Sequence, residues 1–123
     1  PAEPTMSSEP MKEHVLIVYS SPVPGREREY NDWYNNQHLQ DVLTIPGYVR
    51  AQRFKLTDFK LDAAMPDVSH QYAAFYYMET DDPEAALSDL KNRVETGAIG
   101  LCEAMATDFL AYCYVGESPV VTR

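Results

Sequence analysis

The chain of 123 residues has few basic side chains, only two cysteines and no long apolar run. Ten Lys and Arg oppose 19 Asp and Glu, a net charge of −9, so no nucleic-acid partner is expected, because carboxylates repel phosphate. No apolar stretch approaches the roughly 20 residues that cross a bilayer, and residues 1–12 lack the pattern of a secretory signal. These absences favour an acidic, soluble, cytoplasmic protein without a membrane partner.

Sites for metals and cofactors are also scarce in the sequence. Cys102 and Cys113 show no Cys-x-x-Cys spacing, and we expect buried thiols rather than a disulfide or a zinc site. His14, His38 and His70 are dispersed and form no His-x-x-x-His pair, so neither a metal nor a haem on His38 is favoured. A glycine-rich phosphate loop and a nucleophile elbow are absent. We therefore expect no cofactor and no metal.

The composition that remains is that of one globular domain. Hydrophobic residues make up 45% and charged residues 24% of the chain, and its length suits a single core. Residues 1–13 contain three prolines, two serines and few apolar residues, which predicts a flexible N-terminal arm. Residues 14–123 are predicted to form the domain.

Apolar periodicity predicts six regular elements within that domain. Runs of β-branched and aromatic residues indicate strands, and apolar residues three and four positions apart indicate helices. The predicted strands are residues 14–20, 48–56, 70–79 and 107–115, and the predicted helices are residues 26–45 and 82–97. Residues 98–104 are compatible with a short helix or a loop. This order is typical of an α+β, ferredoxin-like (βαββαβ) antiparallel sheet with both helices on one face.

Both faces of that sheet are apolar. In the first strand, Val15, Ile17 and Tyr19 lie on one face, and Leu16 and Val18 lie on the other. A sheet with one solvated face would alternate apolar and polar residues. Because two helices cover only one face, we expect an identical chain to cover the other, sheet against sheet, in a two-fold homodimer. A monomer whose aromatic face is open to a ligand is the alternative.

The first helix and second strand resemble a known superfamily. Asn31–Leu43 (NDWYNNQHLQDVL) and Ile45–Phe54 (IPGYVRAQRF) combine an acidic-Trp-Tyr stretch, a His-Leu pair, Pro-Gly at the helix end and an aromatic strand with arginine. This pattern resembles the dimeric α+β barrel superfamily, and is closest to its EthD-like branch, although Gln37 stands where many members have Glu. Such proteins include cofactor-free monooxygenases, lactone isomerases, polyketide cyclases and haem-handling proteins. The resemblance therefore implies architecture more than chemistry.

His38 is the first candidate for catalysis. Tyr34 lies one turn before it and Asp41 about one turn after it on the predicted inner face of the helix. A carboxylate at that spacing orients an imidazole, and a phenol supplies a second proton-handling group. The alternative is a structural histidine that bonds a carbonyl and fixes the helix to the sheet. We favour the catalytic role, because each polar group buried on this inner face needs a hydrogen-bond partner, and an apolar core would avoid that energetic cost.

Aromatic strand residues suggest where a ligand would bind. Tyr19, Tyr72 and Tyr76 are candidates to line a pocket for a flat, oxygenated molecule between the helices and the sheet. Arg50 and Arg53 fall on opposite faces of the second strand, so at most one of them enters that pocket. Arg53 is the candidate to hold a carboxylate or enolate oxygen, and a salt bridge to a neighbouring acid is its alternative role.

Three functional hypotheses follow from these candidates. The first is a cofactor-independent lyase, isomerase or cyclase acting on a small aromatic, polyketide-like or lactone metabolite, with His38 as acid/base, Asp41 as its orienter and Tyr34 as a hydrogen-bond donor. The second is a non-catalytic small-molecule-binding, stress-related or scaffold dimer. The third is a cofactor-free monooxygenase of phenols. Replacement of His38 by Ala abolishes turnover under the first hypothesis and only lowers stability under the second.

The two-faced sheet generates a testable prediction about assembly. Light scattering or sedimentation at micromolar concentration should show a dimer, since a monomer would expose an apolar patch beyond the roughly 300–600 Å² usual for monomers. Observation of single chains alone would contradict the expected assembly.

Overall fold

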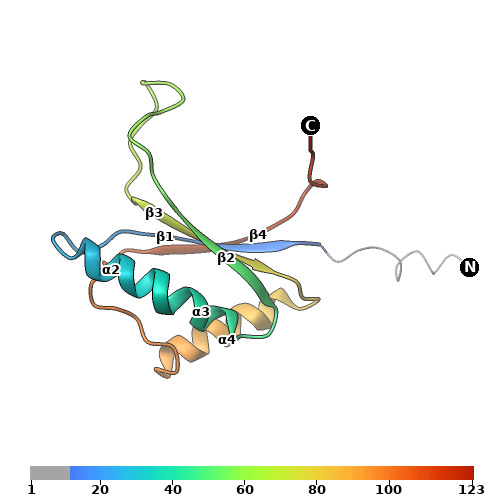
Figure 1. Cartoon of the computed structure of the whole chain (residues 1–123). Helices are drawn as coiled ribbons and strands as arrows, with labels where there is room; N and C mark the ends of the chain where they lie inside the picture. The colour runs from blue at the N-terminus through green and yellow to red at the C-terminus, as the bar shows by residue number, and fades with distance from the viewer. Residues whose placement is uncertain (1–11) are drawn as a thin grey trace, which may run out of the picture.

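The computed structural model describes residues 12–123 as one antiparallel sheet with helices packed on one side (Figure 1). The predicted N-terminal arm lies outside the described residues up to residue 11, and its flexibility stays a prediction. The strands are β1 (His14–Ser20), β2 (Tyr48–Lys55), β3 (Tyr72–Met78) and β4 (Leu110–Val115). The helices are α2 (Glu27–Trp33), η1 (Tyr34–His38), α3 (Leu39–Leu43) and α4 (Pro83–Glu95).

The sheet has the strand order β2-β3-β1-β4, and every neighbouring pair is antiparallel. The two central strands, β1 and β3, are consecutive in space but are separated in the chain by the first helix and β2. The predicted ferredoxin-like architecture is thereby confirmed. Within residues 12–123 no helix is long and apolar enough to span a bilayer.

Several element ends differ from the sequence prediction. β3 begins at Tyr72 and β4 at Leu110, two and three residues later than expected. Before these two strands begin, a side-chain hydrogen bond takes the place of strand pairing. His70 Nε2 donates to the carbonyl oxygen of Asp108 at 2.8 Å. Residues 98–104 contain turns and no helix.

The first helix is continuous in space but changes its winding. α2, η1 and α3 follow one another without a break, and η1 is a π-helical turn in the middle (Figure 1). Gly47 follows the helix with φ of 100°, a left-handed conformation that side chains other than glycine rarely adopt. Its carbonyl oxygen accepts a hydrogen bond from Glu79 N–H at 2.8 Å, which joins the helix end to the end of β3.

A β-bulge near the start of β2 decides which of its residues face the helices. Tyr48 pairs with Met78, and Arg50 pairs with the next residue, Tyr77, so the extra residue Val49 reverses the alternation. Tyr48 and Arg53 consequently share the helix-covered face, while Arg50 lies on the other. The prediction that the two arginines face opposite ways is confirmed.

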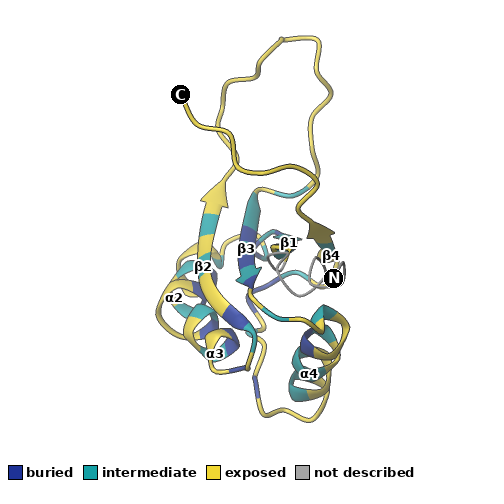
Figure 2. Cartoon of the chain, turned by 90° about the vertical axis from the view of Figure 1, so that its right-hand side faces the viewer, coloured by how far each residue is buried: buried dark blue, intermediate teal, exposed yellow. Residues whose placement is uncertain are grey.

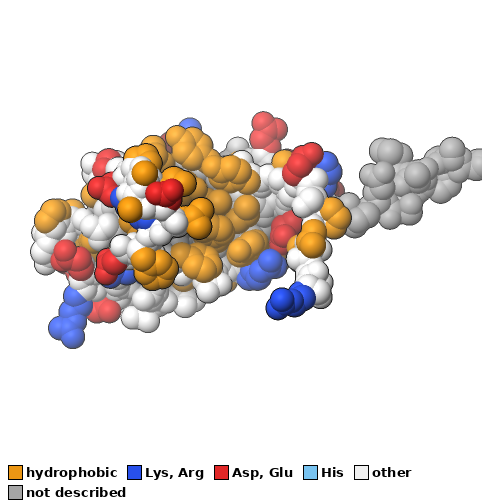
Figure 3. All heavy atoms as spheres, turned by 90° about the horizontal axis from the view of Figure 1, so that it is seen from above, with side chains coloured by type: hydrophobic (Ala, Val, Ile, Leu, Met, Phe, Trp, Pro, Cys, Tyr) orange, Lys and Arg blue, Asp and Glu red, His pale blue; other side chains and the backbone are white. Residues whose placement is uncertain are grey.

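The face of the sheet turned away from the helices, called the open face below, is apolar and uncovered. Its side chains form three cross-strand rows of four: Arg50, Tyr77, Val15 and Tyr114; Gln52, Phe75, Ile17 and Tyr112; Phe54, Ala73, Tyr19 and Leu110. Seen from above, hydrophobic side chains gather over this face (Figure 3). Tyr112 is 52% and Phe54 43% exposed, so the predicted absence of a polar face is confirmed.

The start of α4 provides a test of the forces that hold the helix layer. Asp82 precedes Pro83, and its Oδ1 accepts a hydrogen bond from Ala85 N–H at 3.0 Å. Replacing Asp82 by Ala removes this cap and should lower the free energy of unfolding by about 1 kcal/mol in urea titrations. Asp81→Ala removes the same charge from the neighbouring exposed position and is the control. Equal effects of the two substitutions would contradict the capping role.

Candidate functional site

A cavity of about 490 Å³ lies between the first helix and α4, with the sheet as its floor. This volume is within the range of small-molecule sites, roughly 300–1,000 Å³. Figure 2 shows α4 separated from α2 and α3 below the sheet. The lining residues are Tyr34, His38 and Val42 of the first helix; Leu87, Leu90, Lys91, Val94 and Glu95 of α4; Leu16, Val18, Tyr76, Ala111 and Cys113 of the sheet; and Leu101, Met105 and Phe109.

His38 is the most polar buried group of this wall. It is 7% exposed, and its ring stacks on that of Trp33 with centroids 4.5 Å apart and an interplanar angle of 23°. The ring of Tyr34 meets it edge-on at 5.2 Å. Nδ1 is buried, and no described residue is its hydrogen-bond partner. The imidazole is thus fixed by aromatic contacts while a hydrogen-bonding position stays unused.

The π-helical turn of η1 produces this arrangement. A π-helix closes hydrogen bonds five residues apart, so Trp33 and His38 come face to face across one turn. In a regular α-helix the residue five positions before His38 points away from the inner face, so periodicity alone does not place Trp33 beside the imidazole. The one sequence feature that could have indicated this stacking is an aromatic residue, Trp33, five positions before a histidine.

The same turn corrects the expected role of Asp41. After the extra residue of the π-turn the inner face moves by one position, so Val42 is buried and Asp41 is half-buried. Among the described residues Asp41 makes no hydrogen bond to His38. Its carboxylate acts on the imidazole only through its charge, which favours the protonated ring. Asp41 therefore does not orient His38 as a hydrogen-bonded partner in this structure.

Burial dominates the ionisation of His38. Desolvation lowers the pKa of the imidazole from 6.5 to about 4, and the charge of Asp41 opposes this change without overcoming it. At pH 7 the ring is accordingly neutral. A neutral imidazole accepts a proton or a hydrogen bond, whereas an acid role needs the cation that this environment disfavours.

Two buried phenols stand beside the imidazole. Tyr34 and Tyr76 are each 1% exposed, and both line the cavity. Burial raises the pKa of both hydroxyls, so both are neutral donors at ordinary pH. The Tyr76 hydroxyl has no hydrogen-bond partner among the described residues, although the Tyr34 hydroxyl lies near enough to influence its ionisation. Together with His38 they give one acceptor and two donors on an apolar wall.

Arg53 supports this wall from behind rather than lining the cavity. Its guanidinium carbon lies 4.3 Å from the ring centroid of Tyr34 and 4.9 Å from that of Tyr72. Nη1 donates to Asn35 Oδ1 at 2.7 Å, while Nε and Nη2 are buried without a partner. No carboxylate of residues 12–123 forms the salt bridge considered as its alternative role. Its positive charge is instead placed against the faces of tyrosine rings.

Tyr72 and Tyr19 do not join His38. Tyr72 packs against Tyr30 with ring centroids 5.3 Å apart and accepts a hydrogen bond from Asn31 Nδ2 at 3.3 Å. Tyr19 lies on the open face, because alternation along β1 puts its neighbour Ser20 toward the helices. Both tyrosines line a different hollow, of about 430 Å³. The expected pocket of Tyr19, Tyr72 and Tyr76 is therefore divided between two separate hollows.

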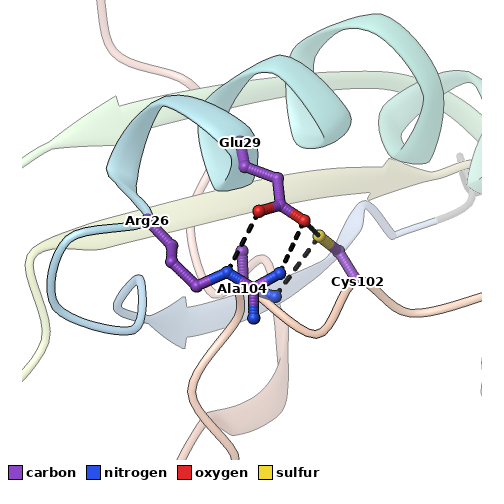
Figure 4. A network of polar contacts seen from close by, with 4 residues as sticks. All are labelled: Arg26, Glu29, Cys102 and Ala104. Atoms are coloured by element: carbon purple, nitrogen blue, oxygen red, sulfur yellow. Dashed lines mark hydrogen bonds and ion pairs between the residues drawn. The ribbon is translucent and has the colours of Figure 1, made fainter.

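The chain segment before β4 lines one side of the cavity and is anchored to the start of α2 (Figure 4). Arg26 donates to both carboxylate oxygens of Glu29, at 3.0 Å and 2.8 Å. Cys102 Sγ lies 3.8 Å from Glu29 Oε2 and accepts from Ala104 N–H at 3.4 Å. These contacts hold the segment that contributes Leu101, Met105 and Phe109 to the cavity, which sequence reasoning did not identify.

Within the part of the chain that the structure describes, no three His, Cys, Asp or Glu side chains gather where they could hold a metal ion. Both cysteines are free and half-buried. The expectation that the chain works without a metal or cofactor stays a prediction.

Solved structures with the same fold were found, whereas no family model and no curated protein matches the sequence. A dimeric ferredoxin-like protein of unknown function from Thermobifida fusca YX aligns with a TM-score of 0.55 at 14% identity, over 85% of this chain and 92% of its own. A candidate antibiotic biosynthesis monooxygenase from Nitrosomonas europaea aligns with a TM-score of 0.53 at 20% identity, over 92% and 98% of the two chains. A candidate monooxygenase from Shewanella loihica PV-4 gives 0.51 at 19% identity, over 92% and 99%.

Identities this low show the fold alone. They confirm the ferredoxin-like α+β fold that the order of strands and helices predicted. An EthD family protein from Bacillus halodurans C-125 aligns with 15% identity over 89% of this chain. Its TM-score of 0.42 adds nothing beyond the common architecture.

The depressed pKa of His38 predicts a pH dependence of stability. Between pH 6.5 and about 4 the unfolded chain binds a proton at this residue that the folded protein does not bind, so folding becomes less favourable as the pH falls through this window. The loss should be about 3 kcal/mol, from ~1.4 kcal/mol per pKa unit.

Glutamine at position 38 takes up no proton, so His38→Gln should lack this component of the pH dependence. Urea unfolding of both proteins at pH 7, 5 and 4, at one protein concentration, measures the difference. An NMR titration in which the His38 ring protonates near pH 6.5 would contradict the desolvated environment.

Proposed function

We propose that this protein is a cofactor-independent enzyme that moves a proton within a small, largely apolar metabolite bearing a carbonyl or phenol oxygen. The observation that supports this most is the contact of a neutral, buried imidazole with an apolar cavity of about 490 Å³. A histidine serving only to fix the helix would use its nitrogens in hydrogen bonds, whereas Nδ1 of His38 has none among the described residues.

The chemistry follows from the protonation states of the three polar groups. Neutral His38 accepts a proton from a C–H or O–H acid of the bound molecule. The phenols of Tyr34 and Tyr76 donate hydrogen bonds to the oxygen on which negative charge develops. Because burial disfavours the imidazolium, the proton returns to the product, at another carbon or at a leaving oxygen. In an isomerase the net change is a shift of a proton and a double bond. In a lyase the proton taken by His38 returns to the oxygen of the group that leaves as a double bond forms, and in a cyclase it returns to the carbonyl oxygen that the new C–C bond converts to a hydroxyl.

The substrate class follows from the lining. The wall is aliphatic and aromatic, with charged residues only in Lys91 and Glu95, both of which are exposed. Aromatic, polyketide-like and lactone metabolites match such a wall with a few polar groups at one end. Arg53 lies behind Tyr34 and outside the cavity lining. Its positive charge stabilises negative charge at the phenol oxygen, which makes Tyr34 a stronger hydrogen-bond donor.

Cofactor-free oxygenation of a phenol is the second candidate. It is favoured by two structures of the same fold whose names are those of candidate monooxygenases. The first step is again proton transfer to His38, which leaves an electron-rich phenolate. That phenolate reduces O₂: one oxygen atom enters the product, which becomes a quinone, and the other leaves as water with two protons. Consumption of O₂ separates this reaction from a proton shift.

A third candidate is a non-catalytic dimer that binds a small molecule or acts in stress or as a scaffold. The same cavity serves for binding, and the neutral donors and acceptor serve for recognition. Ligand binding without turnover distinguishes this candidate from both enzymes.

We further propose that two copies associate through their open faces. The support is the uncovered apolar face of the sheet, together with the neighbour of the same fold whose name describes a dimeric protein (Figure 3). A cytoplasmic location and the absence of nucleic-acid and membrane partners stay predictions from composition.

The proposed function is tested first by ligands and then by variants. A panel of phenols, hydroxyquinones and lactones is screened for thermal stabilisation, and binders are assayed for product formation, exchange of ligand hydrogen with deuterium, and oxygen uptake. His38→Ala should lower turnover at least about a hundredfold, the usual contribution of a general base. Tyr76→Phe should raise KM or lower kcat less strongly.

His14→Ala is the matched control, because His14 lies at the start of β1 outside the cavity lining. Retention of full turnover by His38→Ala would overturn the assignment of the base. Binding of a ligand with neither product, exchange nor oxygen uptake would favour the non-catalytic candidate.

A further inference from the structure

The loop between β2 and β3, residues 56–71, rises from the open face of the sheet (Figures 1 and 2). Leu61 is 96% and Phe59 79% exposed, among the highest values of any large apolar side chain in the described chain. Exposed single apolar residues are common, but two at the end of a projecting loop give it an apolar tip. This tip points toward the side from which a second copy would approach.

Polar contacts within the loop give it a shape of its own. Lys60 Nζ donates to the carbonyl oxygen of Met65 at 2.8 Å and pairs with Asp67 at 2.7 Å. Asp62 Oδ1 accepts from Ala64 N–H at 2.8 Å, and the Asp62 carbonyl oxygen accepts from Met65 N–H at 2.9 Å. The loop is therefore ordered by its own hydrogen bonds, while its apolar tip is left out of the core. Such pre-ordering lowers the entropy cost of docking.

The area of the open face can be compared with the area that a stable dimer buries. A four-stranded sheet with strands of about seven residues spans roughly 19 Å by 23 Å, from strand spacings of ~4.8 Å and rises of ~3.3 Å. The flat footprint is therefore about 440 Å² per copy and under 1,000 Å² for two copies, and the relief of the side chains makes the accessible surface larger than this footprint. Stable, specific interfaces bury about 1,200–2,000 Å². Contact area from the loop would add to the sheet and bring a sheet-on-sheet dimer of this protein further into this range.

An apolar hollow at the base of the loop adds to the surface that a second copy would fill. Its volume is about 430 Å³, and Phe54, Leu56, Val68 and Phe75 contribute to its wall. Leu56 is 52% and Val68 60% exposed. The hollow joins the loop to the last row of the open face, so the apolar surface is continuous from the sheet to the loop.

We infer that residues 56–71 form an intersubunit clasp, in which Phe59 and Leu61 of each copy pack on the body of the other when two open faces meet. The inference rests on the dimer proposed above and specifies which residues stabilise it beyond the sheet. The partner is a second copy of this chain. The loop and the uncovered sheet form one surface, and a two-fold dimer would cover both in each copy at once.

The test compares dimer dissociation constants by sedimentation equilibrium. Phe59→Ser combined with Leu61→Ser should weaken the dimer about tenfold or more, since two buried apolar anchors are lost. Circular dichroism should stay unchanged, because neither side chain contributes to the core. Leu43→Ser is the control: it removes a leucine that is 37% exposed on α3, in the helix layer away from the open face.

A second measurement uses the unaltered protein. Amide hydrogens of residues 57–65 should exchange more slowly above the dimer dissociation concentration than below it. Equal exchange at both concentrations, or an unchanged dissociation constant of the double variant, would overturn the clasp while leaving the dimer in place. A wild-type chain that is monomeric at all concentrations would overturn the proposed dimer and the clasp with it.

Discussion

The π-helical turn from Tyr34 to His38 is the constraint on which the rest of the site depends. An extra residue in one turn lets Trp33 stack on His38 and brings Tyr34 and His38 to the same cavity wall. It also advances the inner face by one residue, so that Val42 rather than Asp41 is buried. Winding of this kind is found mostly as single turns at functional sites, since it gives up regular α-helical bonding for a particular placement of side chains.

This placement has an energetic consequence. His38 Nδ1, the Tyr76 hydroxyl and two nitrogens of Arg53 are buried without partners among the described residues. Each unpaired group costs roughly 1–3 kcal/mol, more where it is charged. Apolar side chains of similar volume would fill the space without this penalty. Two of these groups belong to His38 and Tyr76, which line the cavity, while Arg53 lies behind its wall; unpaired polar groups at a cavity are more typical of a binding site than of a structural core.

The second consequence of the fold is the division of the molecule into two faces with different tasks. Helices and the segment anchored at Glu29 enclose the cavity on one face. The other face presents three rows of mainly apolar side chains, a hollow and a projecting loop, which together form one continuous surface. The cavity and the open face are separated by the thickness of one sheet. Alternate residues of the same strands therefore face the cavity and the open face.

The sequence by itself determined the order of strands and helices, the two-sided apolar sheet and the candidacy of Tyr34, His38 and Tyr76. These depend on local periodicity and on turn residues such as Pro46, Gly47 and Asp82, whose effects act within a few positions along the chain. Only the tertiary structure decided the rest. A π-turn and a β-bulge each insert one residue, and the sequence prediction located neither of them.

The insertions changed which neighbours each candidate has. They removed Asp41 from contact with His38 and set Arg53 behind Tyr34. Strand alternation assigned Tyr19 to the opposite face. Burial, which lowers the pKa of His38 to about 4, arises from residues distant in the sequence that pack around the ring. A group's ionisation is a property of its surroundings, and those exist only once the chain has folded.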